Sequence, residues 1–323
     1  MNDKIGKTDV SYEEHIRELE EMLDSMVDVM STAIDALTPY NARHSKNMTI
    51  RGQAFLRWIN ENEGSLSGRW EHGHISDEEL RRFTLAVQLH DVGKLVTPLH
   101  IMNKDTRLGG YEQRVFGRLR LIGALDKVAF LEGRMPEDIY NERAELLKKA
   151  DNFIRRIDKA ADLSEKDLDF IDRLSHMTYV NESGEEHPWL DPIEISKLSI
   201  RRGTLTRHER GIMEKHAALT AKLLSEMKFP KADAEIPKWA ADHHELLDGS
   251  GYPAHKKGDE IDWHVRLLTI LDVYDALVAR DRPYKKPLPP DESLEIMKDM
   301  ARHGKLDETL LDLFIESGAW QEV

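Results

Sequence analysis

The residues of this chain whose types could do chemistry are histidines and aspartates that fall within apolar helical segments. His90 and Asp91 end one such segment, FTLAVQLHDVGK, in which Phe83, Ala86 and Val87 lie on the helical face of His90. A lone histidine on an apolar face is more often a hydrogen-bonded core residue than a ligand. The adjacent aspartate changes this interpretation, because a carboxylate is costly to bury unless it is paired or bound to a cation.

A second histidine, His216, follows a pattern that predicts the start of a helix. Thr206 and Glu209 have the spacing of a capping box, and Ile212 and Leu219 place His216 on an apolar stripe. Taken alone, this residue would also be interpreted as a core histidine.

The segment WAADHHELLDGSGYP carries the adjacent His243 and His244, which we expect to close a helix before a glycine-rich turn. Neighbours on a helix diverge by about 100°, so two cations, or one cation and a substrate, would use such a pair. A solvated pair favoured by the helix dipole is the alternative. The glycines of the turn would let Tyr252 reach over a pocket.

Asp272 lies inside the apolar run VRLLTILDVYDALV, with Asp275 one turn further along the same face. The buried carboxylate of Asp272 calls for a cation. Asp275 could orient a ligand histidine, move a proton or form a salt bridge. The basic residues that follow, Arg282 and Lys285, are by default a solvated charge run, but their position also suits contact with a phosphate.

Together these positions predict one metal centre, because inward-facing histidines and aspartates at four separate places call for a common explanation. The chain has no cysteine, so nitrogen and oxygen atoms must hold the ion. Imidazole with carboxylate suits iron, manganese, zinc, nickel or cobalt better than calcium.

Helical periodicity, with proline and glycine at the segment ends, predicts an all-α fold that positions these residues. Residues 12–37 form an amphipathic helix, for which core packing is favoured slightly over a dimerising stalk. For residues 108–203 we predict an inserted helical segment with a loop at 181–189. This segment could equally be a lid, a dimer contact or a surface for a partner. We divide the chain into an N-terminal helix, 1–34, and a catalytic domain, 35–323, that contains the insertion.

The composition excludes several classes of protein. The formal charge of −14 argues against a surface for polymeric nucleic acid, which needs clustered cations. No run approaches the roughly 20 apolar residues of a membrane span, and the N-terminus resembles no secretory signal. The absence of cysteine fits a reducing compartment, and we expect a cytoplasmic protein.

Three motifs resemble those of the HD-GYP family within the HD phosphohydrolase superfamily: HDVGK at 90–94, HHELLDGSGYP at 243–253 and LDVYDALVARDRPYKK at 271–286. The resemblance implies a helical HD-domain bundle and a bacterial cyclic di-GMP phosphodiesterase with two or three metal ions, often iron or manganese. It covers roughly residues 35–107 and 204–310.

The resemblance also implies roles for single residues. Asp91 would bridge two ions, Lys94 would reach the scissile phosphate and Asp275 would support the metal aspartate or move a proton. His44 matches a histidine that is a ligand in some members, and we expect it to be either a substrate-side group or an occasional ligand. The implied metal ligands are His90, Asp91, His216, His243, His244 and Asp272, and the implied substrate contacts are Tyr252, Arg282, Lys285 and His44.

Members with three metals carry glutamate four residues before the histidine that corresponds to His44, where this chain has Tyr40. We therefore expect two divalent ions per chain and a bridging hydroxide that attacks the phosphodiester in line. The expected product is the linear dinucleotide pGpG.

Two alternatives stay open. The substrate could be the mixed cyclic GMP-AMP dinucleotide or another nucleotide phosphoester. The chain could instead be a non-hydrolytic module that senses a cyclic dinucleotide or a metal, and that relays its state to a diguanylate cyclase or a sensor partner. A homodimer through the N-terminal helix would suit such a relay.

Overall fold

The computed structural model describes residues 2–37, 43–279 and 287–323, with side chains from residue 14 onward. Within them the fold is helical apart from one two-stranded hairpin, which confirms the all-α prediction. Their contacts divide these residues into two units, one with residues up to 99 and from 212 onward, the other with residues 100–211. No helix in the described ranges combines the length and the apolar character that a membrane span requires.

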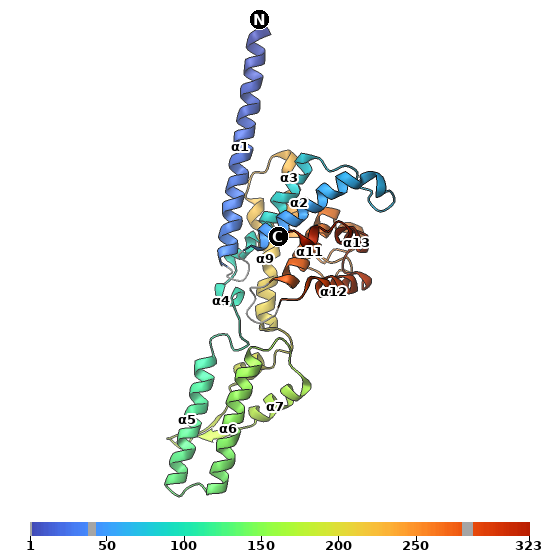
Figure 1. Cartoon of the computed structure of the whole chain (residues 1–323). Helices are drawn as coiled ribbons and strands as arrows, with labels where there is room; N and C mark the ends of the chain where they lie inside the picture. The colour runs from blue at the N-terminus through green and yellow to red at the C-terminus, as the bar shows by residue number, and fades with distance from the viewer. Residues whose placement is uncertain (1, 38–42, 280–286) are drawn as a thin grey trace. The chain divides into compact units, whose positions relative to one another are not determined.

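The first unit contains the N-terminal and C-terminal helices (Figure 1). Its main helices are α1 (Asn2–Leu37), α2 (His44–Asn62), α3 (Asp77–Leu89), α9 (Arg207–Ser225), which begins just before the unit, α10 (Ile236–Ala241), α11 (Trp263–Val278), α12 (Pro290–Arg302) and α13 (Glu308–Glu316). Short 3-10 helices add η1 (Glu63–Ser65), η2 (Val92–Val96), η3 (Lys231–Asp233), η4 (Gly258–Glu260) and η5 (Ala319–Gln321).

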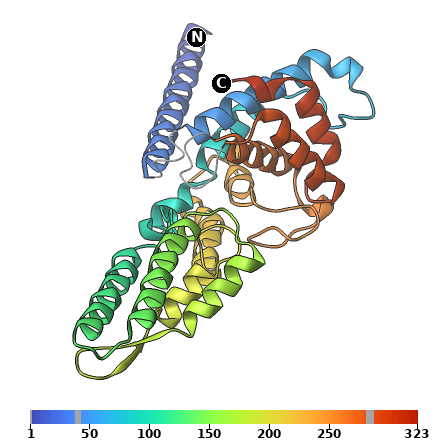
Figure 2. The same ribbon diagram turned by 60° about the horizontal axis from the view of Figure 1, so that its bottom comes forward.

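The core of this unit joins α2 and α3 to the C-terminal helices, drawn in red in Figure 2. Phe55 of α2 contacts Phe314 of α13, with 6.0 Å between ring centroids, and Tyr274 of α11 contacts the same ring. Gly52 allows α2 to approach α3, because a Cβ at this position would lie 2.9 Å from the Phe83 ring. The helices α2, α3 and α11, which carry part of the site, therefore share one apolar core.

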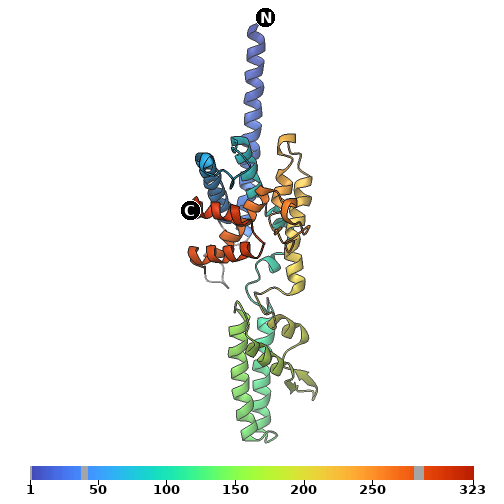
Figure 3. The ribbon, with the colours of Figure 1, turned by 90° about the vertical axis from the view of Figure 1, so that its right-hand side faces the viewer.

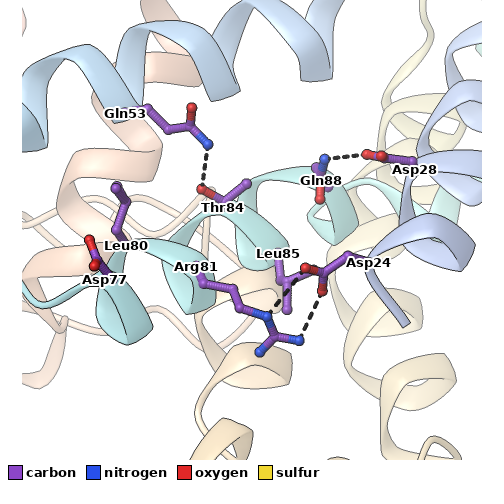
Figure 4. A pocket seen from close by; sticks show the side chains of 9 residues that line it. All are labelled: Asp24, Asp28, Gln53, Asp77, Leu80, Arg81, Thr84, Leu85 and Gln88. Carbon is purple, nitrogen blue, oxygen red and sulfur yellow. Dashed lines mark hydrogen bonds and ion pairs between the residues drawn. The ribbon is translucent and has the colours of Figure 1, made fainter. Parts of the chain in front are cut away.

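Helix α1 is one uninterrupted helix (Figure 1), and its C-terminal half packs on a second apolar cluster that contains residues of α3, α9 and α10. Val27 and Ile34 are buried. Figure 4 shows Arg81 of α3 paired with Asp24 of α1, at 2.9 Å between Nη2 and Oδ1. Other apolar side chains of α1 are exposed: Ile16 and Leu19 toward the N-terminus, and Met22, Met26 and Val29 closer to the packed half.

The second unit is a helical hairpin with smaller elements around it. Figure 3 shows α5 (Glu112–Leu131) and α6 (Glu137–Asp158) side by side. The other elements are α7 (Glu165–Ser175), α8 (Pro192–Leu198), the strands β1 (Thr178–Val180) and β2 (Glu186–Pro188), and the leading turn α4 (Leu99–Met102). The helical spacing predicted around residues 146–157 is confirmed, since Leu147, Ala150, Ile154 and Ile157 are buried.

The prediction of a loop at 181–189 is wrong in part. Strand β2 lies within this range and pairs antiparallel with β1, with Thr178 opposite Pro188. Pro188 is tolerated because it ends its strand on a two-stranded edge. Trp189, which follows, is completely buried and donates from its indole nitrogen to the main-chain oxygen of Thr178. This apolar anchor holds the polar segment against the hairpin of α5 and α6.

Candidate metal centre

The first part of the site is the turn after α3. Ser76 caps the start of α3, and the helix ends at Leu89, so that His90 and Asp91 lie before η2. His90 is fully buried and Asp91 is 3% exposed. Gly93 is required here, because a Cβ would lie 2.0 Å from the main-chain oxygen of His216. This close approach brings the turn against α9.

The other candidates come from three further segments. Thr206 and Glu209 form the predicted capping box of α9, with main-chain to side-chain bonds in both directions, and His216 follows two turns later. Asp272 lies on α11. His243 and His244 do not close α10 as expected; this short helix ends at Ala241, and the pair lies in the following turn.

Three of the histidines are held in the same way. Each ring donates from Nδ1 to the main-chain oxygen three residues earlier: His90 to Val87 at 2.6 Å, His216 to Met213 at 2.7 Å and His243 to Ala240 at 2.7 Å. A proton on Nδ1 leaves a lone pair on Nε2 of the neutral ring. The main chain thus aims three Nε2 atoms at one place.

These atoms meet at short range. Nε2 of His216 lies 3.4 Å from Nε2 of His243 and 3.4 Å from Oδ1 of Asp91. On the other side of Asp91, Oδ2 lies 3.2 Å from Nε2 of His90. The ligand atoms form three groups, each within 4.8 Å: His216, His243 and His244; His44, His90 and Asp272; and His90, Asp91 and His243.

This donor set fits divalent cations. Oδ1 of Asp91 is buried and accepts no hydrogen bond from any described residue. Lone pairs that face one another repel unless a cation or a proton lies between them, and a buried carboxylate oxygen without a donor is costly. The Nδ1 protons of the three neutral rings are already donated to main-chain oxygens. The facing lone pairs on Nε2 are therefore best satisfied by cations.

The protonation states agree with that fit. Burial lowers the pKa of His216 and His243, and it lowers the pKa of His244 to about 4. Burial opposes the charge of Asp91, but His90 and Lys94 hold the pKa of that carboxyl well below its usual range. Neutral imidazoles around an ionised carboxylate are the forms that bind a metal.

His44, which we expected to be either a substrate-side group or an occasional ligand, lies within the cluster. Its Nε2 is 3.3 Å from Nε2 of His90 and 3.2 Å from Oδ1 of Asp272. Burial works against the charged ring, but hydrogen bonds with Asp272 and Asp275 raise the pKa of His44 to about 10. Nε2 of His44 can therefore hold a proton that is shared with Asp272, or bind a cation in its place.

The remaining predicted residues fall into two sets. Lys94 donates to Oδ2 of Asp91 at 2.5 Å, and the ring of Tyr252 lies 4.7 Å from that of His244. Gly251 permits this placement, since a Cβ would lie 2.3 Å from the nitrogen of Leu246. Arg282, Lys285 and Tyr40 lie outside the described residues.

Sequence reasoning missed several residues that support the site. Arg51 and Asn47 of α2 donate to Asp275. Thr220 accepts from the nitrogen of Gly93 and donates to the oxygen of His90. Glu245 accepts from the nitrogen of Ala254 at 2.6 Å and so holds the turn that carries Tyr252. Helical spacing marks Arg51 one turn past Asn47, but nothing in the sequence pairs either residue with α11.

Comparison with known proteins gives a family and its relatives. The family described as HD domain matches residues 191–310. A 3'3'-cGAMP-specific phosphodiesterase 3 of Vibrio cholerae is 37% identical over 112 residues, which cover 33% of this chain and 24% of that protein. A cyclic di-GMP phosphodiesterase of Thermotoga maritima is also 37% identical over 112 residues, 34% of this chain and 29% of that protein.

A structural relative is an HDG"Y"P protein from Bdellovibrio bacteriovorus, with a TM-score of 0.43, 12% identity and coverage of 92% of this chain and 63% of that one. At this level the two structures are only loosely alike. The chain spans less than a third of the length of the two curated relatives above. Residues 191–310 match the HD domain family, and the relatives are cyclic-dinucleotide phosphodiesterases, so the resemblance predicted from the three motifs is confirmed for this part of the chain.

Proposed function

We propose that this chain is a metal-dependent phosphodiesterase for cyclic dinucleotides, with cyclic di-GMP as the first choice and linear pGpG as the product. One observation carries the proposal: three Nε2 atoms, fixed by main-chain hydrogen bonds, surround the buried carboxylate of Asp91, whose Oδ1 has no donor among the described residues. The curated relatives named above act on cyclic dinucleotides.

The roles of the residues follow from their positions. His216, His243 and His244 would hold one divalent cation, His44, His90 and Asp272 a second, and Asp91 would lie between them. Such cations, most plausibly iron or manganese, supply an activated water and stabilise charge on a phosphodiester. Lys94 would orient the carboxylate of Asp91. Its ammonium group, which is partly exposed, would also bind a phosphate oxygen of the substrate.

Two roles in the proposal become narrower. Asp275 uses one oxygen for His44 and the other for Arg51, so we assign it the orientation of His44 and not the protonation of the leaving group. The ring of Tyr252 lies beside His244 and could pack against a base or ribose. Arg282 and Lys285 keep their proposed contacts with the substrate.

A second substrate has its own support, because several relatives are named as specific for 3'3'-cGAMP. The test is to load the purified chain with Fe²⁺ or Mn²⁺ without oxygen, to count bound metal, and to follow cyclic di-GMP and 3'3'-cGAMP by chromatography. We expect about two ions and cleavage of cyclic di-GMP to pGpG. Cleavage of 3'3'-cGAMP alone would replace the first substrate, and bound metal without cleavage of either would favour a sensing module.

The histidines allow a matched control. His243→Gln should lose metal and turnover. His264→Gln should keep both, because His264 is also a buried histidine but its two nitrogens already pair with Asp262 and Glu79 at 2.6 and 3.0 Å. If His243→Gln kept its metal and turnover, the site assignment would be wrong.

The division into an N-terminal helix, 1–34, and a catalytic domain, 35–323, is part of this proposal, as is a homodimer through α1. Ile16, Leu19 and Met26 of α1 are 56%, 60% and 56% exposed and follow the spacing of a coiled-coil seam. Sedimentation of Leu19→Glu tests the dimer: we expect a monomer from this variant, and a wild-type monomer would contradict the proposal.

A further inference from the structure

A buried arginine on α2, Arg51, supports Asp275 but has no role of its own in the metal site derived so far. Arg51 is 6% exposed, although a guanidinium is always charged and costly to bury without partners. Its Nη1 donates to Oδ1 of Asp275 at 2.5 Å. Its guanidinium carbon lies 5.1 Å from the centroid of the Tyr274 ring, within range of a cation–π contact. Two successive residues of α11 therefore hold this one side chain.

The contact with Arg51 determines what Asp275 can do. Oδ1 of Asp275 accepts from Arg51 and, at 3.3 Å, from Nδ2 of Asn47, while Oδ2 lies 2.7 Å from Nδ1 of His44. Both oxygens are thus engaged by α2. The carboxylate cannot rotate to present another edge to His44 without breaking the bond to Arg51.

His44 in turn has only one orientation that keeps this bond. With Nδ1 donating to Asp275, Nε2 points at Oδ1 of Asp272 and Nε2 of His90. The hydrogen bonds from Arg51 to Asp275 and from Asp275 to His44 therefore connect Arg51 to the ligand group of His44, His90 and Asp272. The group formed by His216, His243 and His244 contains none of these residues.

We infer that Arg51 is a positioning residue for a divalent cation held by His44, His90 and Asp272, and that it acts through Asp275. This inference rests on the proposed function only in requiring that the site binds divalent cations. It predicts that Arg51 affects one ligand group and leaves the other intact. Loss of an outer partner of a metal ligand typically weakens affinity by about 10- to 100-fold.

The experiment titrates metal-free full-length protein with Mn²⁺ and follows free Mn²⁺ by electron paramagnetic resonance. We expect two classes of site in the wild-type chain, and in Arg51→Met one class weakened by about 10- to 100-fold. Arg51→Lys, which keeps the charge but not the planar fork, should recover part of the affinity. Arg107→Met is the matched control, since Arg107 is a fully buried arginine that donates to main-chain oxygens of residues 157–200.

A double-mutant cycle tests whether Arg51 acts through Asp275. If it does, Arg51→Met combined with Asp275→Asn should weaken Mn²⁺ binding no further than Asp275→Asn alone. Additive losses, or a folded Arg51→Met with both classes of site unchanged, would overturn the inference. If Arg51→Met does not fold, Arg51→Lys decides: unchanged affinities for both classes would then overturn it.

The result is separable from the fate of the proposed function. A wild-type chain that binds Mn²⁺ in two classes but cleaves no cyclic dinucleotide would contradict the function and leave the role of Arg51 standing. If the wild type cleaves a cyclic dinucleotide and Arg51→Met binds Mn²⁺ as the wild type does, the role of Arg51 would be contradicted and the proposed function would stand. A wild-type chain that binds no Mn²⁺ would overturn both.

Discussion

Buried charge in the second unit is arranged differently from the buried groups of the candidate metal centre in the first unit. In the second unit, the fully buried Glu194 forms a two-pronged pair with Arg118, at 2.6 and 3.1 Å, and Glu209 accepts from Lys104 and Lys197. In the first unit, lone pairs of His216 and His243 face each other and Oδ1 of Asp91 lacks a donor. Paired charges stabilise a fold, whereas opposed lone pairs call for an added cation.

The substitution Asp91→Asn tests most strongly whether the buried groups of the first unit serve a cation rather than the fold. We expect turnover to fall by about 1,000-fold or more, because the charge that would lie between two cations is lost. Stability of the metal-free chain should fall only modestly, because removal of the unpaired Oδ1 charge offsets part of the lost ion pair with Lys94. Turnover and thermal unfolding in chelator measure the two effects, and a large loss of stability would mean that Asp91 is mainly structural.

Glu194→Ala makes the opposite test in the second unit. Removal of Glu194 leaves Arg118 with the carboxylate of Asp191 but without its two-pronged partner, which costs about 1 to 3 kcal/mol. Urea unfolding followed by circular dichroism should report this loss, while Mn²⁺ binding should be unchanged in the folded fraction. The control Arg118→Met with Glu194→Met, which removes both charges, should be less destabilised than Glu194→Ala.

We expect acid to destabilise the second unit by protonating Glu209. Burial opposes its charge, but hydrogen bonds from Lys104, Thr206 and Lys197 lower the pKa of Glu209 to about 2. Because the folded pKa lies below the unfolded value, this stabilisation is present above about pH 4.5 and is lost as the pH falls toward 2. We expect Glu209→Gln to lose about 1 to 3 kcal/mol at pH 7 and to converge with the wild type near pH 2. A constant difference across that range in unfolding experiments would contradict the assignment.

The smallest effect is expected at an exposed pair of the same unit. Arg201 and Glu165 are paired, with side chains 65% and 74% exposed. Water and salt screen such a pair, so Glu165→Gln should leave the melting temperature unchanged within error. A measurable loss would show that burial is not what separates the two kinds of charge.

Much of the site could be predicted from local sequence. His90, His216 and Asp272 each lie at helical spacing from apolar neighbours, and Gly93 and Gly251 mark turns that only glycine permits. The position of His44 beside His90 and Asp272 could not be predicted, because no local pattern reports which distant residues a ring will contact. The loop expected at 181–189 contains a strand for the same reason: Trp189 is anchored by the packing of α5 and α6, not by its neighbours in sequence.

The sequence alone determined that helices dominate, that cysteine could not hold a metal, and that histidine and aspartate recur on inward faces, because periodicity and residue type act over one or two helical turns. Only the tertiary structure decided which Nε2 atoms oppose each other, that Asp91 has an oxygen left for a cation, and that Arg51 reaches Asp275 across 224 positions of chain. These contacts arise from the packing of α2, α3, α9 and α11, and a hydrogen bond between distant segments leaves no periodic trace in the sequence of either.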